Sequence, residues 1–290
     1  MKLNYVNKIK ANISIYSSKK TTNLLDGTYK SIYMGKSMNF ENLREYVIND
    51  DIKDIDWKAS ARSGTLYVKQ FIAEKKHNIL LVMDTGMKMS ADTSKHQKKK
   101  DVALFTAGTI GYLAIKNNDY VGMIYTDSKK IQYKPFKPTL YNLEEYLCDY
   151  YKNYSLKEVD INSLLKFAYK NIQKKMIVFV ITDIEGINNI KTSVLKELNQ
   201  KADILVVNID DNYMFGNDVY DVEDNKYIPK SFLNDSKLHK VEKEIRKDLL
   251  RKNVLKLKRK NTCFVSIDSV ENINYKIIEL LEEHKNVSIN

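Results

Sequence analysis

The chain has 290 residues, with 48 Lys and Arg against 37 Asp and Glu, which gives a formal net charge of +11. Hydrophobic residues make up 43% and charged residues 29%, with only 3 Pro and 9 Gly, a composition that excludes disordered and fibrous proteins. The longest apolar runs, 79–83 and 176–181, are far too short to span a bilayer, and no apolar signal segment opens the chain. We therefore expect a cytoplasmic protein without a membrane span.

The first 77 residues contain short segments in which apolar and polar residues alternate. Leu66 to Phe71 is their clearest strand, and Phe40 to Tyr46 has a helix-like pattern. We expect residues 1–77 to form a small β-rich module that packs on a larger domain formed by residues 78–290.

From residue 78 onward, short apolar strands alternate with amphipathic helices. This alternation predicts a Rossmann-like α/β domain with a mostly parallel sheet and helices on both faces. The predicted strands are 79–83, 120–125, 131–133, 176–181, 204–209 and 263–267, and the predicted helices are 101–116, 140–151, 161–173, 192–201, 234–260 and 270–283.

The excess of positive charge is greatest between residues 234 and 260. Leu238, Val241, Ile245 and Leu249 recur there at helical spacing, which predicts an amphipathic helix with a lysine-rich outer face. A solvated helix face is the ordinary interpretation, and a site for a polyanion or an acidic partner is the alternative. Because lysines on a helix contact phosphates without reading bases, we expect no sequence-specific nucleic-acid binding.

Acidic residues follow three of the predicted strands. Asp84, Asp183 and Asp210 each stand at a strand's carboxyl end, the edge of an open parallel sheet where ligands bind. Carboxylates gathered there can bind a hard divalent cation. The alternative is that these Asp residues only cap helices.

The four histidines are scattered, without a nucleophile motif beside them, so the sequence does not indicate a catalytic histidine.

The stretch from Leu43 to Gln70 carries a specific motif. It reads LREYVINDDIKDIDWKASARSGTLYVKQ and resembles the domain of unknown function 58 family, whose members have a von Willebrand factor type A domain after a small β-rich module. Asn49 and Lys53 depart from the family's usual Gly and Arg. The matching residues include Leu43, Arg44, Glu45, Tyr46, Asp50, Ile55, Asp56, Trp57, Lys58, Ser60, Ala61 and Arg62.

The resemblance implies a metal-ion-dependent adhesion site, in which a D-x-S-x-S motif, a Thr and a further Asp hold a divalent cation. Asp84 and Asp183 match the two acidic positions. Gly86 and Lys88 replace the serines, and Val159 stands at the Thr position, so three oxygen ligands are lost. We therefore expect no bound Mg²⁺ or Mn²⁺, no other cofactor, and a Lys88 ammonium that neutralises the two carboxylates.

Trp57, the only Trp, has two interpretations. We expect it to anchor the core of the small module, with Arg44 and Arg62 paired to nearby acids. The alternative is a recognition surface for a partner, formed by four charged residues of the motif: Asp54, Asp56, Lys58 and Arg62.

The function that the resemblance implies is a non-enzymatic protein–protein interaction. Members of the family are associated with MoxR-type AAA+ ATPases, which suggests a role in the assembly or maturation of a complex. The alternative is a metal-dependent nuclease or phosphodiesterase that uses Asp84, Asp183 and Asp210.

Overall fold

Six strands of the chain form one sheet in the computed structural model, which describes residues 4–16, 24–29, 42–48, 50–70, 76–127, 130–153, 159–215, 218–222, 224, 226–229 and 234–289. The strand order is β10-β7-β6-β3-β4-β5, and every neighbouring pair is parallel except β4 and β5. The strands are β3 (Asn78–Met83), β4 (Tyr120–Thr126), β5 (Ile131–Lys137), β6 (Met176–Asp183), β7 (Ala202–Ile209) and β10 (Cys263–Ile267).

The sheet has the doubly wound order of Rossmann-like folds. Counted along the chain, its strands lie in the order 3-2-1-4-5-6, so the winding reverses between β3 and β6. The predicted fold class, a mostly parallel α/β sheet, is confirmed. β5 is the exception because it follows β4 through the short turn at Asp127, and such a turn joins antiparallel strands.

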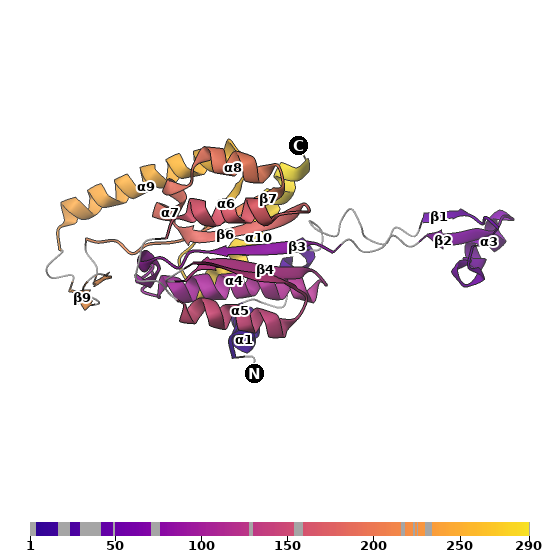
Figure 1. The fold of residues 1–290 in the computed structure, drawn as a ribbon, viewed down its shortest axis with the longest axis horizontal. Helices are drawn as coiled ribbons and strands as arrows, with labels where there is room; N and C mark the ends of the chain where they lie inside the picture. Colours follow the sequence, from indigo (N-terminus) through magenta and orange to yellow (C-terminus); the bar gives the residue numbers. More distant parts are fainter. Residues whose placement is uncertain are drawn as a thin grey trace.

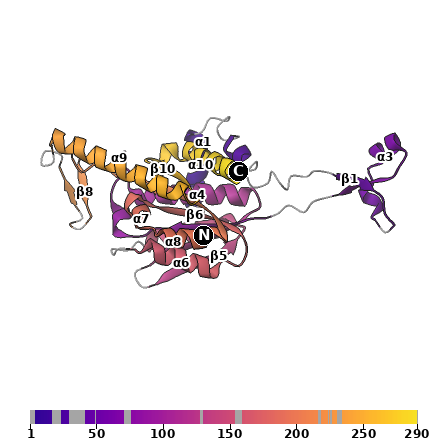
Figure 2. The same cartoon turned by 90° about the horizontal axis from the view of Figure 1, so that it is seen from above.

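Helices cover both faces of the sheet (Figures 1 and 2). Successive side chains of a strand point to opposite faces, so Leu81 of β3 packs in one core and Leu80 in the other. One face is covered by α1 (Asn4–Tyr16), α4 (Lys99–Lys116), α5 (Leu140–Lys152) and α10 (Ile273–Ile289), and the other by α6 (Ile161–Asn171), α7 (Ile184–Asn189), α8 (Thr192–Asn199) and the last turns of α9 (Ser236–Lys258).

The N-terminal helix belongs to the large domain, and not to a module of residues 1–77 as predicted. Val6 and Ile9 of α1 are fully buried in the core cluster on the α4 side of the sheet. A Cβ at Gly108 of α4 would lie 2.0 Å from Ile9 Cδ1, so this glycine permits the close approach of the two helices. The buried Glu144 carboxylate accepts the first N–H groups of α1, from Tyr5 at 2.9 Å and Val6 at 2.8 Å.

Residues 42–48 and 50–70 form a small unit, here called the hairpin module. Its antiparallel pair is β1 (Asn42–Glu45) and β2 (Tyr67–Gln70), and between them lie the short helices η1 (Ile52–Asp54) and α3 (Trp57–Ser63). The strand predicted at 66–71 is confirmed, whereas the helix predicted at 40–46 is wrong. Pairing with β2 determines the structure of this segment, because its polar Asn42, Arg44 and Glu45 form no apolar helical face.

The N-terminal half of α9 extends beyond the body of the domain, with the hairpin of β8 (Val219–Asp221) and β9 (Lys226–Ile228) beside it (Figures 1 and 2). No helix in the described part of the chain is long and apolar enough to cross a membrane. Cys148 and Cys263 are both free thiols.

Candidate functional site

The candidate site lies where the winding of the sheet reverses. Asp84 directly follows β3 and Asp183 ends β6, and these two strands are neighbours, so both carboxylates lie at one edge. Their exposed fractions are 0% and 1%. Charged carboxylates at such depth require partners, because burial without them is strongly unfavourable.

Asp84 is held by neutral donors. Its Oδ1 accepts the Gly86 N–H at 2.8 Å, and its Oδ2 accepts the Thr182 hydroxyl at 2.5 Å. Burial is the largest influence on this carboxyl and raises its pKa, although Lys88 nearby acts in the opposite direction. A neighbouring cation therefore helps the Asp84 carboxylate to remain ionised.

Lys88 lies in the short helix η2 (Met87–Ser90) and reaches both carboxylates. Its Nζ is 3.2 Å from Asp183 Oδ1 and 3.6 Å from Asp84 Oδ2. Burial opposes its charge, but the two carboxylates outweigh burial and keep the pKa of Lys88 above its ordinary value. The position predicted for this ammonium, between Asp84 and Asp183, agrees with the structure.

A second lysine completes the site. Lys99, the first residue of α4, is 1% exposed, and its Nζ donates to Asp183 Oδ2 at 2.8 Å and to Asp211 Oδ1. Sequence reasoning missed this residue because it stands in a run of three lysines that looks like a solvated surface. One signal was present, since a helix that follows β3 begins at the same sheet edge as Asp84.

Asp183 joins the two ammonium groups. It accepts from Lys99, lies in contact with Lys88, and also accepts the Gly186 N–H at 2.9 Å at the start of α7. Burial alone would raise its pKa, but Lys99 and Lys88 hold it below the ordinary value. We call Asp84, Asp183 and Asp211 the carboxylate cluster; the ammonium groups of Lys88 and Lys99 supply two positive charges beside its three carboxylates.

The residues of this site do not fit a divalent cation. A Cβ at Gly86 would lie 3.7 Å from Val159 Cβ, so these two residues do lie side by side, and neither side chain offers an oxygen. The Lys88 ammonium contacts both carboxylates that would ligate the metal. Among the described residues, no group of three or more His, Cys, Asp or Glu side chains could hold a metal ion. Repulsion between the two ammonium groups and a divalent ion disfavours its binding.

Asp210 lies apart from the cluster's ion pairs. Its carboxylate accepts the Ser94 hydroxyl at 2.6 Å, and it is the next residue, Asp211, that pairs with Lys99. The set of three carboxylates predicted from the sequence contained Asp210, whereas the structure places its neighbour Asp211 in the cluster.

The polar residues of the family motif stabilise the hairpin module. Arg44 in β1 donates to Asp50 through both terminal nitrogens, at 2.7 and 2.5 Å, which confirms the predicted pairing of this arginine. The Asp56 carboxylate accepts the N–H groups of Lys58 and Ala59 and so caps α3. These hydrogen bonds order a segment with little apolar core of its own.

Ser60 links α3 to β2. Its hydroxyl donates to the carbonyl oxygen of Asp56 and accepts the N–H of Tyr67, both at 2.8 Å. Tyr46 continues the pairing of β1 through its N–H to Leu66. Three charged residues of the motif are exposed: Glu45, Lys58 and Arg62.

Trp57 does not anchor the core of the module. Its side chain is 63% exposed, whereas the small core is made by Ile55 and Val68, which are 7% and 4% exposed. The prediction was wrong: Trp57 occupies the first position of α3, directly after the cap at Asp56, and its side chain is open to solvent there. The side chain of Asp54, one of the four charged residues in the alternative recognition surface, lies outside the described residues.

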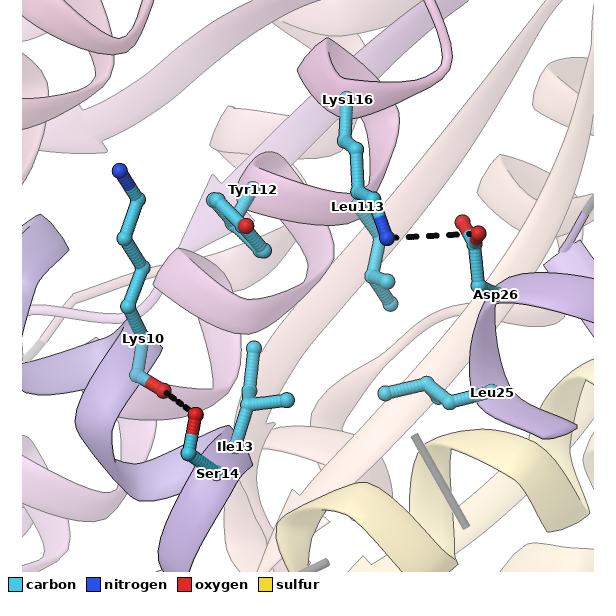
Figure 3. Close-up of a pocket in the computed structure, with 8 residues that line it drawn as sticks. All are labelled: Lys10, Ile13, Ser14, Leu25, Asp26, Tyr112, Leu113 and Lys116. Carbon is cyan, nitrogen blue, oxygen red and sulfur yellow. Dashed lines mark hydrogen bonds and ion pairs between the residues drawn. The ribbon is translucent and has the colours of Figure 1, made fainter. Parts of the chain in front are cut away.

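A hollow of about 280 Å³ lies between α1 and α4, on another side of the domain (Figure 3). Lys116 pairs with Asp26 across its rim at 3.3 Å, and Ser14 donates to the carbonyl oxygen of Lys10. These contacts are surface ion pairs and helix hydrogen bonds without a reactive arrangement, so we assign no function to this hollow.

The family model described as "Protein of unknown function DUF58" matches residues 42–215. The chain belongs to this family. The matched segment contains the hairpin module together with Asp84, Lys88, Lys99 and Asp183, so the predicted resemblance is confirmed. None of the curated proteins matches the chain.

Several solved structures are similar to the chain at low identity. The conserved hypothetical protein BatB from Bacteroides thetaiotaomicron is 15% identical, over 74% of this chain and 100% of that chain, with a TM-score of 0.46. An aerotolerance-related membrane protein from Bacteroides fragilis is 14% identical, over 71% and 99%, with a TM-score of 0.45. A von Willebrand factor type A protein from Catenulispora acidiphila is 8% identical, over 76% and 44%, with a TM-score of 0.42.

Proposed function

We propose that the protein is a non-enzymatic protein–protein interaction module that binds its partner through the hairpin module. The observation that carries this proposal is the exposure of Trp57. Three further apolar side chains of the same short segment are exposed: Val47 at 61%, Ile48 at 84% and Ile52 at 66%. Several exposed large apolar side chains on so small a unit are typical of a docking surface.

The motif contains residues that stabilise the hairpin module and an exposed Trp57 that does not, and this difference supports the proposed function. Arg44, Asp50, Asp56 and Ser60 satisfy one another and the backbone, so the module is ordered without burying Trp57. An aromatic side chain that is already held on an ordered helix loses little conformational freedom when a partner covers it. Trp is also among the residues that contribute most to binding energy at interfaces.

For the partner we propose a MoxR-type AAA+ ATPase, in keeping with the family resemblance, and a role in the assembly or maturation of a complex. Cytoplasmic location belongs to the same proposal, and cell fractionation tests it.

The carboxylate cluster favours an interaction role over the nuclease alternative. That alternative requires a cation on Asp84, Asp183 and Asp210, but lysines neutralise the first two, and Asp210 bonds to Ser94. Ion pairs with lysines at this sheet edge support a structural role for its carboxylates.

The experiment is an affinity capture from native lysate, with and without ATP, followed by mass spectrometry. We expect the wild-type protein to enrich a MoxR-type ATPase, and Trp57→Ala to reduce the captured amount at least about tenfold, the scale for losing an aromatic anchor at an interface. The matched control is Tyr275→Ala, which removes an aromatic side chain of similar exposure, 65%, from α10.

Thermal unfolding of both variants gives the second readout. Because Trp57 and Tyr275 are largely exposed, both substitutions should leave the melting temperature of the protein nearly unchanged. Capture of the ATPase by Trp57→Ala at the wild-type level contradicts the proposed docking surface. Capture of no ATPase by the wild-type protein contradicts the proposed partner.

A further inference from the structure

The N-terminal half of α9 leaves its apolar side chains uncovered. Leu238, Val241 and Ile245 are 45%, 49% and 61% exposed, although their spacing of three and four residues places them in one stripe. The sequence pattern predicted that this stripe would be the buried face of the helix. The structure shows that it is not.

Polar side chains hold α9 in place instead. Glu242 accepts the N–H groups of Met214 and Phe215 at 2.8 and 3.0 Å, and His239 Nδ1 lies 2.5 Å from the carbonyl oxygen of Phe215. Arg246 pairs with Glu242 at 2.8 Å and donates to the carbonyl oxygen of Asp211 at 3.0 Å. Because this polar edge of the helix attaches it to the domain, the apolar stripe beside it stays open.

The same side of α9 continues into a basic hollow. Leu238, Ile245, Lys252 and Arg259 follow one another at intervals of seven residues, which is about two helical turns, so they share one face. The hollow has a volume of about 440 Å³ and is lined by Thr192, Lys252, Leu255, Lys256, Arg259 and Lys260.

Within the hollow, Lys256 is a structural residue. Its ammonium donates to the carbonyl oxygens of Ile187, Asn188 and Ile190 at 2.7, 3.0 and 3.1 Å. Lys252 and Arg259 are exposed on either side of it, and Leu255 is 49% exposed between them. The hollow therefore combines exposed positive charges with a small apolar surface.

We propose that this face of α9 and its C-cap residue, defined by Leu238, Val241, Ile245, Lys252 and Arg259, is a docking surface for an acidic amphipathic helix of a partner protein. The α9 face offers apolar contact at one end and positive charge at the other. Only a ligand that carries apolar and acidic side chains on one surface uses both ends. An amphipathic helix supplies them at the same spacing as α9.

Charge and composition argue against three other occupants. A second copy of the chain, itself at +11, would bring like charges together on this face. Nucleic acid would use the basic hollow but gain nothing from the aliphatic stripe. A membrane-surface helix usually inserts Trp, Phe or several Leu side chains, whereas the stripe holds one Leu, one Val and one Ile.

This surface is separate from the hairpin module and does not depend on the function proposed for Trp57. The test is fluorescence anisotropy of the full chain with a labelled synthetic helix that has leucines along one face of its first half and glutamates along the same face of its second half. We expect saturable binding, and about tenfold weaker binding to a peptide whose leucines are replaced by serine.

Two pairs of substitutions separate the ends of the surface. Val241→Ser with Ile245→Ser, and Lys252→Glu with Arg259→Glu, should each weaken peptide binding about tenfold or more, while Trp57→Ala leaves it unchanged. Lys166→Glu with Lys170→Glu, which makes the same charge change on exposed positions of α6, should have little effect. Circular dichroism and thermal unfolding check that each variant is folded.

Other outcomes overturn the proposal. Absence of peptide binding contradicts it. Peptide binding that is unchanged in the Val241→Ser and Ile245→Ser double variant also contradicts it, because the apolar stripe would then not contribute to binding. Random duplex DNA, polyglutamate or phosphatidylserine vesicles that bind as tightly as the peptide, with sensitivity only to the lysine and arginine substitutions, would identify the face as a general polyanion surface.

Discussion

Lys99 and Asp183 form an ion pair at 2.8 Å in which both side chains are only 2% exposed. The pair joins the start of α4 to the end of β6, the strand that lies beside β3 at the centre of the sheet. Asp183 also contacts Lys88, and Lys99 also contacts Asp211, so one chain of charges connects η2, β6, α4 and the segment after β7.

Removal of Lys99 should be strongly destabilising. Lys99→Met leaves Asp183 buried without its nearest cation, and we expect a loss of about 3–5 kcal/mol in the free energy of unfolding, the scale for breaking a buried pair. Urea unfolding measures it. Lys175→Met is the control, because the Lys175 side chain is 75% exposed in its pair with Asp203, and it should leave the free energy of unfolding nearly unchanged. Equal effects of the two substitutions would contradict a structural role for Lys99.

Lys88→Met should cost less, about 1–3 kcal/mol, because 22% of the lysine side chain is exposed although both carboxylates that it contacts are buried. A double-mutant cycle with Asp84→Asn tests the pairing. If the ammonium neutralises Asp84, removing the carboxylate as well should recover part of the loss. Purely additive effects would show that Lys88 and Asp84 do not interact energetically.

Acidification should change the contributions of Asp183 and Asp84 to the free energy of unfolding in opposite directions. The pKa of Asp183 is lowered, so its stabilising contribution is present at neutral pH and is lost as the pH falls through its pKa in the folded state. The pKa of Asp84 is raised, so its ionisation opposes folding, and acidification from neutrality towards about pH 4 relieves that cost. Removing the Asp84 carboxylate therefore removes a contribution that acts against the acid sensitivity due to Asp183.

We accordingly expect the free energy of unfolding to fall more steeply between about pH 7 and pH 3 in Asp84→Asn than in the wild-type protein. Chemical denaturation at a series of pH values measures both profiles. Parallel profiles would contradict the raised pKa of Asp84.

The sheet was predictable because its signal is local. Runs such as 79–83 and 176–181 are apolar throughout, as expected of short strands that are buried on both faces of a sheet. Along the chain, these runs alternate with helices. The N-terminal helix α1 was missed because its buried residues, Val6, Ile9 and Ile13, are separated by lysines and asparagines, and its docking depends on the distant Gly108 and Glu144.

The residues of the site were predictable only where a strand end or a motif spacing identifies the position in the sequence. Asp84, Lys88 and Asp183 follow from strand ends and motif spacing. Lys99 and Asp211 are in contact although 112 residues separate them in the sequence, and the periodicity of apolar residues cannot predict a contact between such distant residues. Trp57, Leu238 and Ile245 show the converse, since apolar character predicts burial and the structure places all three outward.

Lysine ammonium groups lie beside the carboxylates that a divalent cation would otherwise neutralise. Calorimetric titration of Mg²⁺ and Mn²⁺ into the wild-type protein, Gly86→Ser with Lys88→Ser, and Asp84→Asn tests this role of the lysines most directly. The double variant removes one ammonium and introduces two hydroxyl ligands. We expect no saturable binding by the wild-type protein or Asp84→Asn at micromolar metal, and measurable binding by the double variant. A micromolar site in the wild-type protein that disappears in Asp84→Asn would contradict the account.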